Sequence, residues 1–342
     1  MDIELLRERS RIIRQVRAFF DEQQYLEADT PLLSPDLIPE SCLEVFETSR
    51  IPPPGSKTRQ PEPYWLIPSP EIWMKKLIAD HQQSLYQICK CFRNGESTGR
   101  FHSPEFTMLE YYTMDADYLD SLTITEELFS SLLENSDQPG LRPPFLRITM
   151  EEAFSRWAGF DLYKAAADGS MENEARRLGL DPLPGLDTAS LYDLIFIHTV
   201  EPNLPKDKPA ALIDYPAFVP CLAQKNKDGK TVERWELYAR GIELANCYSE
   251  ETDAEEVRRF FETESAEKEK HALVKHHVDQ DYWKNFLPRS NTVFPVGKDL
   301  GFPKGKSSGF PPCSGVAMGL DRLIMVLTGR SAIDGVLPFP MA

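Results

Sequence analysis

The sequence lacks the features that place a chain in a membrane or in an oxidising compartment. None of its apolar runs approaches the roughly 20 residues that cross a bilayer. Its first ten residues carry charges of both signs, unlike a secretion signal. Its six cysteines are scattered along 342 residues without the spacing of a disulfide framework. We therefore expect a cytoplasmic protein with reduced thiols and no membrane partner.

Basic residues are also in short supply. Lys and Arg number 38 against 54 Asp and Glu, which gives a formal net charge of −16. Binding to a nucleic acid backbone needs clustered positive charge, so the balance weighs against a nucleic acid partner. A basic excess with loop-like composition is found at Lys284–Lys306. Cys89 and Cys91 form at most half of a metal site, because no second ligand pair lies near them in the sequence.

Two alternating stretches predict an antiparallel hairpin with a long loop. Leu85–Arg93 and Glu105–Met114 have a period of two, and the segment between them is rich in Gly, Asn, Ser and Thr. Glu110 stands among large apolar neighbours, where a carboxylate needs a cationic or hydrogen-bonding partner. Arg93 ends the first strand and directs a permanent charge into the loop. Either the two side chains pair with each other, or both bind a ligand.

Val232–Glu250 predicts a second strand pair, and this one is rich in carboxylates. A tight turn at Ala239-Arg240 would place Glu236 directly opposite Glu243, with Cβ atoms about 4.5–5.5 Å apart. Two carboxylates that close repel each other unless a cation lies between them, and hard oxygen ligands suit Mg²⁺. The alternative is a pair of solvated carboxylates on an edge strand.

Strict alternation along this segment has a further consequence. It places Asn246 and Glu250 on the face opposite Glu243. A single site that uses all three side chains therefore requires a bulge or a strand end near Cys247.

Apolar residues at helical spacing predict the remaining elements. An amphipathic helix over Asp2–Gln24 runs into a strand that ends at Pro31, and Ser69-Pro70-Glu71 opens a helix through Ala79. Gly140–Pro209 carries no recognisable site and is interpreted as an insertion packed on the sheet. Further helices are expected at Tyr118–Glu134, Glu172–Leu178 and Ser190–Val200, from Asp253 to about His271 with a solvated charged face, and at Leu320–Leu327.

Three segments, in order, resemble the signature motifs of class II aminoacyl-tRNA synthetases in their lysyl form. The helix and strand that end at Pro31 resemble motif 1, and Gly315–Arg322 resembles motif 3. Phe92-Arg93-Asn94 and, after a short loop, His102-Ser103-Pro104-Glu105-Phe106-Thr107-Met108-Leu109-Glu110 resemble motif 2. The resemblance implies an α+β fold, with an antiparallel sheet flanked by helices, as one catalytic domain over residues 1–342.

The resemblance also implies an ATP site. Arg93 would hold the substrate carboxylate and the α-phosphate, Phe106 would pack against adenine, and Arg322 would hold the γ-phosphate. Arg93 and Arg322 are thus the expected catalytic residues. Glu236 and Glu243 would bind Mg²⁺. The full set of implied ATP-binding residues is Arg93, Asn94, Glu96, His102, Ser103, Phe106, Glu243, Leu244, Gly319 and Arg322.

The implied amino-acid site carries carboxylates for a substrate with two ammonium groups. The alternative for Glu71 is that it only complements the helix dipole. Ala317 stands where lysyl-tRNA synthetases carry glycine, so its methyl group narrows the pocket. The implied substrate-binding residues are Ser69, Pro70, Glu71, Glu110, Tyr112, Asn246, Glu250 and Ala317.

Lysyl-tRNA synthetases have an anticodon-binding barrel before motif 1, and this chain begins at the motif 1 helix, so we expect the catalytic core to stand alone. It is similar to the branch of the family that ligates (R)-β-lysine to elongation factor P. That resemblance implies ATP, Mg²⁺, lysine or β-lysine, elongation factor P as the acceptor rather than tRNA, and a homodimer formed through motif 1.

Three alternatives stay open. Motif 1 could be a plain surface helix packed on its own sheet. The chain could charge tRNA as a synthetase. It could also be a nucleotide-binding pseudo-enzyme, although such a protein would be expected to lose Arg93, Glu243 or Arg322, and all three are present.

Overall fold

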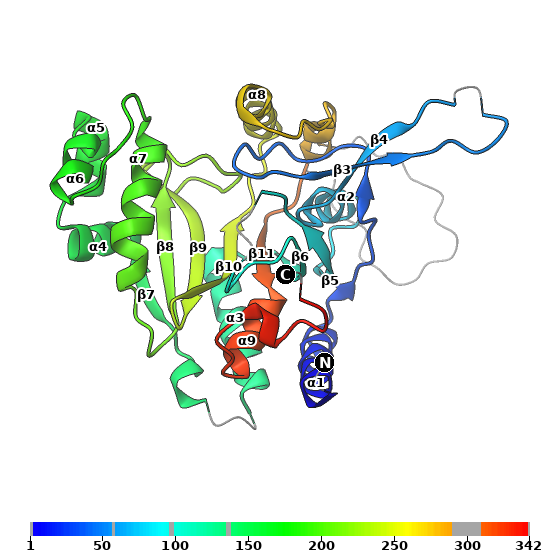
Figure 1. The fold of residues 1–342 in the computed structure, drawn as a ribbon, viewed down its shortest axis with the longest axis horizontal. Coiled ribbons are helices and arrows are strands. Elements are labelled where there is room, and N and C mark those ends of the chain that lie inside the picture. The colour runs from blue at the N-terminus through cyan, green and yellow to red at the C-terminus, as the bar shows by residue number, and fades with distance from the viewer. Residues whose placement is uncertain (1–2, 57–58, 96–98, 135–137, 289–308, 341–342) are drawn as a thin grey trace.

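The computed structural model describes residues 3–56, 59–95, 99–134, 138–288 and 309–340. Its centre is an eight-stranded sheet in the order β1-β5-β6-β11-β10-β9-β8-β7, and a three-stranded sheet has the order β2-β4-β3 (Figure 1). The strands are β1 Leu26–Glu27, β2 Leu33–Ser34, β3 Phe46–Arg50, β4 Glu62–Leu66, β5 Leu85–Phe92, β6 Glu105–Met114, β7 Leu146–Thr149, β8 Ala210–Pro216, β9 Thr231–Ala239, β10 Ile242–Ser249 and β11 Cys313–Gly319.

The predicted antiparallel sheet is confirmed for the central strands and is wrong at the two edges. Neighbouring strands from β5 to β8 are antiparallel, whereas β1 pairs with β5 and β7 pairs with β8 in parallel. Parallel neighbours need a long crossover connection. The chain provides one at each edge, because β2–β4 and α2 separate β1 from β5, and helices α4–α7 separate β7 from β8.

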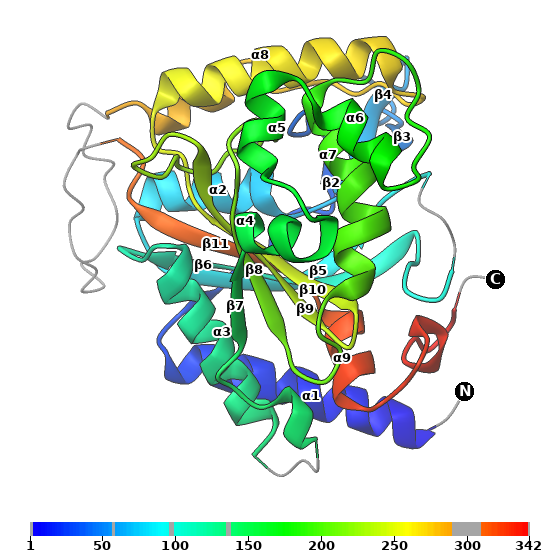
Figure 2. The same cartoon turned by 90° about the vertical axis from the view of Figure 1, so that its left-hand side faces the viewer.

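Helices cover both faces of the sheet, so the molecule has three layers (Figure 2). The helices α1, α3 and α9 lie on one face, and α2 and α8 lie on the other. The helices are α1 Ile3–Glu22, α2 Glu71–His81, α3 Tyr118–Leu132, α4 Met150–Ala153, α5 Leu162–Asp168, α6 Met171–Arg177, α7 Thr188–Ile195, α8 Ala254–His271 and α9 Leu320–Leu327.

The first helix docks through the apolar stripe that its sequence predicts. Phe20 stacks on Tyr86 of β5 with ring centroids 4.8 Å apart, and both side chains are fully buried. Arg9, on the same face of α1, reaches the start of α9 and pairs with Asp321, with 2.6 Å between Nη1 and Oδ1. The helix is therefore fixed to the sheet by apolar area and to α9 by a buried charge pair.

The insertion expected at 140–209 is shorter than predicted. The strand β7 lies in the central sheet, and the helical part begins after it at Met150. Helices α4 to α7 then pack around a core of their own beside the sheet edge (Figure 1). The helix α5 was not predicted, because its seven residues include three alanines and give almost no apolar periodicity.

The charged face of α8 is solvated only in part, which corrects the sequence interpretation. Glu264 and Lys268 are 7% and 5% exposed. Both bind backbone groups of residues 40–43, which lie against the helix. Buried charges are tolerated where such hydrogen bonds satisfy them.

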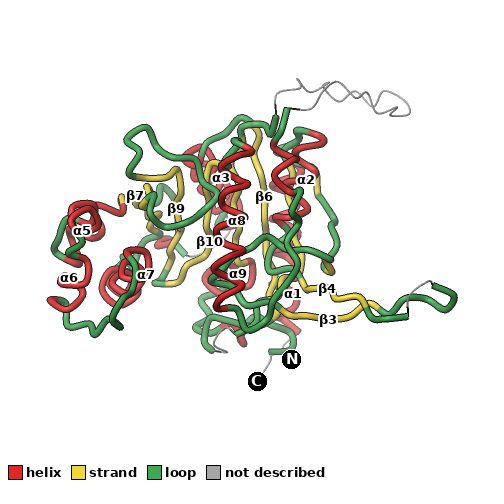
Figure 3. Tube along the Cα trace, turned by 90° about the horizontal axis from the view of Figure 1, so that it is seen from above, coloured by secondary structure: helices red, strands yellow, loops and turns green. Residues whose placement is uncertain are grey.

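The smaller sheet carries a projecting arm. The strands β3 and β4 pair as a hairpin that extends away from the three layers (Figure 3). Within the described ranges, no helix is long and apolar enough to cross a bilayer.

Candidate active site

Two adjoining cavities lie where β5, β6, β10 and β11 meet. The acidic cavity measures about 200 Å³, and its carboxylates are Glu40, Glu71, Glu110, Glu250 and Glu264. The arginine cavity measures about 230 Å³ and includes Arg93 and Arg322. Their common wall consists of Arg93, Met108, Asn246 and Ala317.

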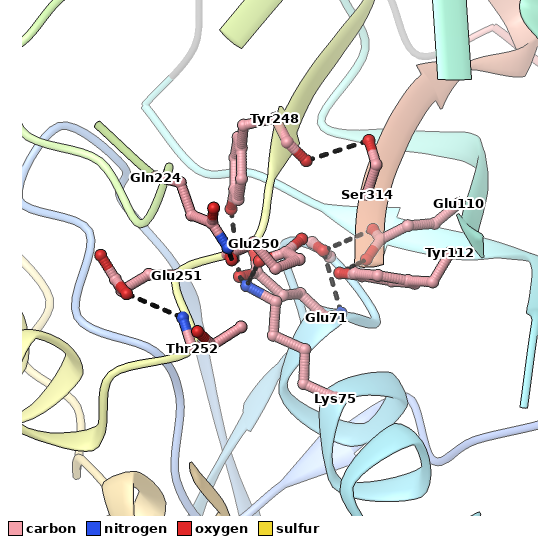
Figure 4. Close-up of polar contacts among 11 residues, drawn as sticks. Glu71, Lys75, Glu110, Tyr112, Gln224, Tyr248, Glu250, Glu251, Thr252 and Ser314 are labelled. Atoms are coloured by element: carbon pink, nitrogen blue, oxygen red, sulfur yellow. Dashed lines mark hydrogen bonds and ion pairs between the residues drawn. The ribbon is translucent and has the colours of Figure 1, made fainter. Parts of the chain in front are cut away.

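A buried lysine holds two of the carboxylates in the acidic cavity. Lys75 Nζ lies 2.5 Å from Glu71 Oε1 and 2.6 Å from Glu250 Oε2, and its side chain is 1% exposed (Figure 4). The Tyr248 hydroxyl also donates to Glu71 Oε1, at 3.2 Å. Glu71 and Lys75 are four residues apart on α2 and therefore share a helix face. Glu71 thus does more than complement the dipole of α2.

Glu110 is held by two hydroxyl groups. Ser69 Oγ donates to Oε2 at 2.7 Å, and the Tyr112 hydroxyl donates to Oε1 at 2.8 Å. Tyr112 follows Glu110 by two residues on β6, so both side chains face the cavity. The interpretation that Glu110 is held by Arg93 is therefore replaced by this pair of neutral donors.

The acidic cavity holds more negative charge than its fixed cation offsets. Burial, followed by the neighbouring Glu71, raises the pKa of Glu110 to about 8 and that of Glu40 to about 7. Burial also raises the pKa of Glu250 to about 8, against the opposing effect of Lys75. Burial and the crowding of carboxylates thus favour the protonated form of these groups near neutral pH, and a cationic ligand would favour the charged form.

The strand β10 serves both cavities because of a bulge. Arg240 and Gly241, both with positive φ, form the turn, one residue later than predicted. Glu243 pairs with Tyr238, the register then shifts between Glu243 and Ala245, and Asn246 pairs with Glu236. The prediction that Glu236 lies directly opposite Glu243 is therefore wrong.

The bulge also explains how Glu243, Asn246 and Glu250 can share one face, which strict alternation along the segment would not allow. It falls at Leu244, three residues earlier than the predicted position near Cys247. The extra residue brings Glu243 and Asn246 to the same face, where both line the arginine cavity. Beyond it, Asn246, Tyr248 and Glu250 line the acidic cavity.

Arg322 crosses the arginine cavity from the first turn of α9. Its Nη1 donates to the Glu243 carbonyl oxygen at 3.0 Å and lies 3.5 Å from Glu243 Oε2, and its Nε donates to the Phe101 carbonyl at 3.1 Å. On the other side, the Arg93 guanidinium lies 5.3 Å from the Phe106 ring centroid. Two cations thus face a cavity with an aromatic wall, which suits a nucleotide.

Three buried side chains, Arg9, Thr107 and Asp321, connect α1 to two of the elements that form the arginine cavity. Asp321 Oδ2 accepts the Thr107 backbone N–H at 2.6 Å, and Arg9 Nη2 donates to Thr107 Oγ1 at 2.9 Å. Arg9 also pairs with Asp321, so α1, β6 and α9 are joined at one point. These elements carry the three motifs that the sequence singled out.

The structure brings most of the predicted site residues together. The predicted residues in the acidic cavity are Ser69, Glu71, Glu110, Tyr112, Asn246, Glu250 and Ala317. Those in the arginine cavity are Arg93, His102, Ser103, Phe106, Glu243, Leu244, Gly319 and Arg322.

Other predicted residues lie elsewhere. Pro70 is the N-cap of α2 and lines neither cavity. Asn94 binds the backbone of Val45 and Gly95 and so shapes the loop after β5. Glu96 and most of Lys284–Lys306 lie outside the described residues.

The sequence interpretation missed Lys75, Tyr248, Glu40 and Asp321. Lys75 carried a signal, since it stands one helical turn after Glu71. Tyr248 and Asp321 lie inside predicted segments, but their roles depend on the bulge in β10 and on the contact between α9 and α1. Glu40 gave no local signal, because α8 brings its loop to the cavity.

The residues present fit a magnesium ion held jointly with nucleotide phosphates. Mg²⁺ in such sites takes one or two carboxylates and fills the remaining positions with phosphate oxygens and water. Burial and then Glu236 raise the pKa of Glu243, which lines the arginine cavity, whereas Glu236 lines neither cavity. Glu236 is bound by Arg234 at 2.6 Å and by the Tyr238 hydroxyl at 2.8 Å. Among the described residues, no cluster of three metal-ligating side chains is present.

Comparison with known proteins agrees with this geometry. A family model described as tRNA synthetases class II (D, K and N) matches residues 3–286 and 297–342. The chain belongs to this family.

The similar curated proteins narrow the class further. Two of them are the elongation factor P–(R)-β-lysine ligases of Avibacterium paragallinarum, 34% identical, and Pasteurella multocida strain Pm70, 32% identical. A third, of the same name, is that of Histophilus somni strain 2336, 33% identical. Each match covers 98% of this chain and 95% of the relative.

Proposed function

We propose that the protein is an ATP-dependent ligase that activates (R)-β-lysine, or lysine, as an acyl-adenylate and transfers it to a lysine side chain of elongation factor P in the cytoplasm. The observation that carries this function is the common wall between the two cavities. This wall supports a site for a dicationic amino acid directly beside a site for a polyphosphate. Membership of the class II family and the names of the relatives support the same chemistry.

The first half-reaction joins the two substrates. A carboxylate oxygen attacks the α-phosphorus of ATP, and pyrophosphate leaves. Arg93, in the common wall, is positioned to neutralise charge that builds on the α-phosphoryl oxygens, and Arg322 to hold the departing phosphates. A magnesium ion held by Glu243, with Glu236 close by, would supply further neutralisation.

The acidic cavity selects the amino acid. The raised pKa values of Glu110 and Glu250 favour protons that an incoming ammonium group can displace, and Lys75 lies between Glu71 and Glu250. A substrate with one ammonium group leaves part of this charge unmatched, and buried unmatched charge is costly. The cavity therefore favours a diamino acid.

The function is tested by ATP–pyrophosphate exchange with lysine, (R)-β-lysine and neutral amino acids. We expect exchange with the diamino acids only. Arg93→Ala should lower its rate by about 10²–10³, the usual loss for one preorganised donor. Arg50→Ala, a surface variant on β3, is the matched control. Exchange with neither diamino acid, in folded protein, would refute the proposal.

The acceptor is tested by transfer of the radiolabelled amino acid to elongation factor P and to bulk tRNA in parallel. We expect label on the protein. Charging of tRNA, with none on the protein, would favour the tRNA synthetase alternative.

A further inference from the structure

A loop closes the acidic cavity and is held by buried charges. We call Glu40–Glu44 the capping loop. Lys268 Nζ, from α8, donates to the carbonyl oxygens of Glu40 at 2.9 Å and Leu43 at 2.7 Å. Glu264 Oε2 accepts the Ser41 backbone N–H at 3.0 Å. The loop is thus fixed at one end of the cavity by hydrogen bonds that solvent reaches poorly.

The same loop is tied to the segment that carries Arg93. The Asn94 backbone N–H donates to the Glu44 carbonyl oxygen at 2.9 Å, and the Glu44 carboxylate accepts from the backbone N–H groups of Leu273 and Val274. The position of the capping loop relative to the Arg93 segment is therefore set by direct contacts.

Glu40 and Glu264 are the cavity carboxylates that the proposed amino-acid site does not use, and Glu264 is already bound to the Ser41 backbone N–H. Glu71, Glu110 and Glu250 are each held by a hydroxyl or by Lys75, whereas no side-chain hydrogen bond or ion pair of Glu40 is found in the part of the chain that the structure describes. Its side chain is half-buried and lines the cavity, so it is open to a ligand that arrives from solvent. The titratable and charged groups near its carboxylate are Glu71, Arg93, Lys75, Lys268, Cys42 and Tyr248.

The second half-reaction requires a group of this kind. The acceptor lysine reaches the enzyme as an ammonium ion, and it attacks only as the neutral amine. Its nitrogen forms a bond to the acyl carbon, the bond from that carbon to the phosphate oxygen breaks, and AMP leaves with the electron pair. Two protons must leave the nitrogen, one to free the amine for attack and one as the amide forms. A carboxylate that lines the same cavity as Arg93 is placed to receive the first, and solvent takes the second.

We propose that Glu40 binds the ammonium group of the acceptor lysine and takes the first of its two departing protons, which frees the amine to attack the acyl-adenylate. This inference rests on the proposed function, because it assigns a residue to the transfer step of the same reaction. It makes the capping loop the contact between the active site and the protein substrate. Burial and Glu71 raise the pKa of Glu40 to about 7, which suits a base that works near neutral pH.

The test separates the two half-reactions in Glu40→Gln. In single-turnover transfer from the enzyme-bound radiolabelled adenylate to elongation factor P, we expect a loss of about 10²-fold or more. Hydroxylamine is a neutral nucleophile at pH 7.5, so capture of the same adenylate by hydroxylamine should stay within about threefold of wild type. The wild-type transfer rate should rise to a plateau above pH 7, whereas the rate of the variant should keep rising with pH because it depends on the free amine. Glu40→Asp should restore part of the rate.

Glu47→Gln, an exposed position on β3, is the matched control and should transfer normally. Transfer within threefold of wild type by Glu40→Gln would overturn the inference. So would an equal fall in exchange, hydroxylamine capture and transfer, because Glu40 would then act on the amino acid. Absence of exchange in the wild type would instead refute the proposed function.

Discussion

At the scale of single residues, we expect Ala317 to influence the choice between isomeric substrates. Its methyl group lies in the wall common to both cavities, and it pairs with Glu110 on one side and Asn246 on the other. Lysine and β-lysine share a carbon skeleton and differ in the position of one amine. A difference of one methylene in a pocket is worth about 1–3 kcal/mol, or roughly 10- to 200-fold in specificity.

We therefore expect Ala317→Gly to shift the preference toward α-lysine within that range, with little change in ATP affinity. The ratio of kcat/KM for the two amino acids, determined in the wild type and in Ala317→Gly, measures this shift in preference. An unchanged ratio would assign selectivity to the carboxylates instead.

Lys75 is expected to stabilise the fold strongly. Removing one partner of a buried ion pair costs about 3–5 kcal/mol, because the remaining charge loses its compensation. Lys75→Met should lower the free energy of unfolding by about that amount in urea titrations. Lys76→Met is the control on the same helix, since Lys76 is 30% exposed and pairs with Asp279. The Lys76→Met variant should lower the free energy of unfolding by less than about 1 kcal/mol. Equal losses of stability in the two variants would contradict the assignment of Lys75 to a buried ion pair.

The ligand-free protein should lose stability as pH rises. The folded pKa of Glu110 is about 8, above its ordinary value of 4.5. The native state therefore keeps a proton that the unfolded state releases, and stability falls as pH rises from about 4.5 to 8. Glu250 acts in the same direction. Urea unfolding at pH 5.5 and 8.5 measures the difference, and Glu110→Gln should reduce it. A more stable protein at pH 8.5 would contradict these assignments.

At the scale of elements, β11 needs a glycine at the acidic cavity. A Cβ on Gly315 would overlap Glu250 Oε1 and would lie 2.5 Å from Tyr112 Cε1. Gly315→Ala should therefore displace both side chains and raise the KM for the amino acid at least tenfold. At Gly335, a Cβ meets only Arg330, at 3.6 Å, which makes Gly335→Ala the control. Normal KM in Gly315→Ala would mean that these side chains do not bind substrate.

Element boundaries were predicted well where local pattern decides them. The hairpin strands appear as β5 and β6, and the Asp2–Gln24 helix appears as α1, within two residues at each end. The bulge at Leu244 was misplaced, because a one-residue register shift leaves no trace in the apolar pattern of an irregular strand. The capping loop was missed, since its position depends on contacts with α8, over 200 residues later in the chain.

At the scale of the whole molecule, the motif 1 region has the surface expected of a dimer interface. Leu26 and Leu33 are 56% and 48% exposed on β1 and β2, and Ile3 is exposed at the start of α1. We predict a homodimer in sedimentation velocity and a shift to monomer in the Leu26→Glu/Leu33→Glu variant. Leu183→Glu, at another exposed leucine, is the control. A monomeric wild type would favour the alternative that α1 only covers its own sheet.

The fold class and most of the residues of the candidate site can be predicted from sequence motifs, whereas the balance of charge in the acidic cavity cannot. The motifs locate Arg93, Glu110, Glu250 and Arg322, yet none reveals that Lys75 already occupies the space between Glu71 and Glu250. Counting carboxylates overestimates the cationic charge that the cavity accepts. Only the packed structure shows how much of that charge is left for a ligand.

The common wall of Arg93, Met108, Asn246 and Ala317 has a thermodynamic consequence. Any ordering of these side chains by the amino acid alters the surface that the nucleotide meets, and the reverse holds too. Linkage then requires reciprocity: the factor by which bound nucleotide tightens the amino acid must equal the factor by which bound amino acid tightens the nucleotide. We therefore expect these four shared residues to make the two binding equilibria cooperative before any bond is formed.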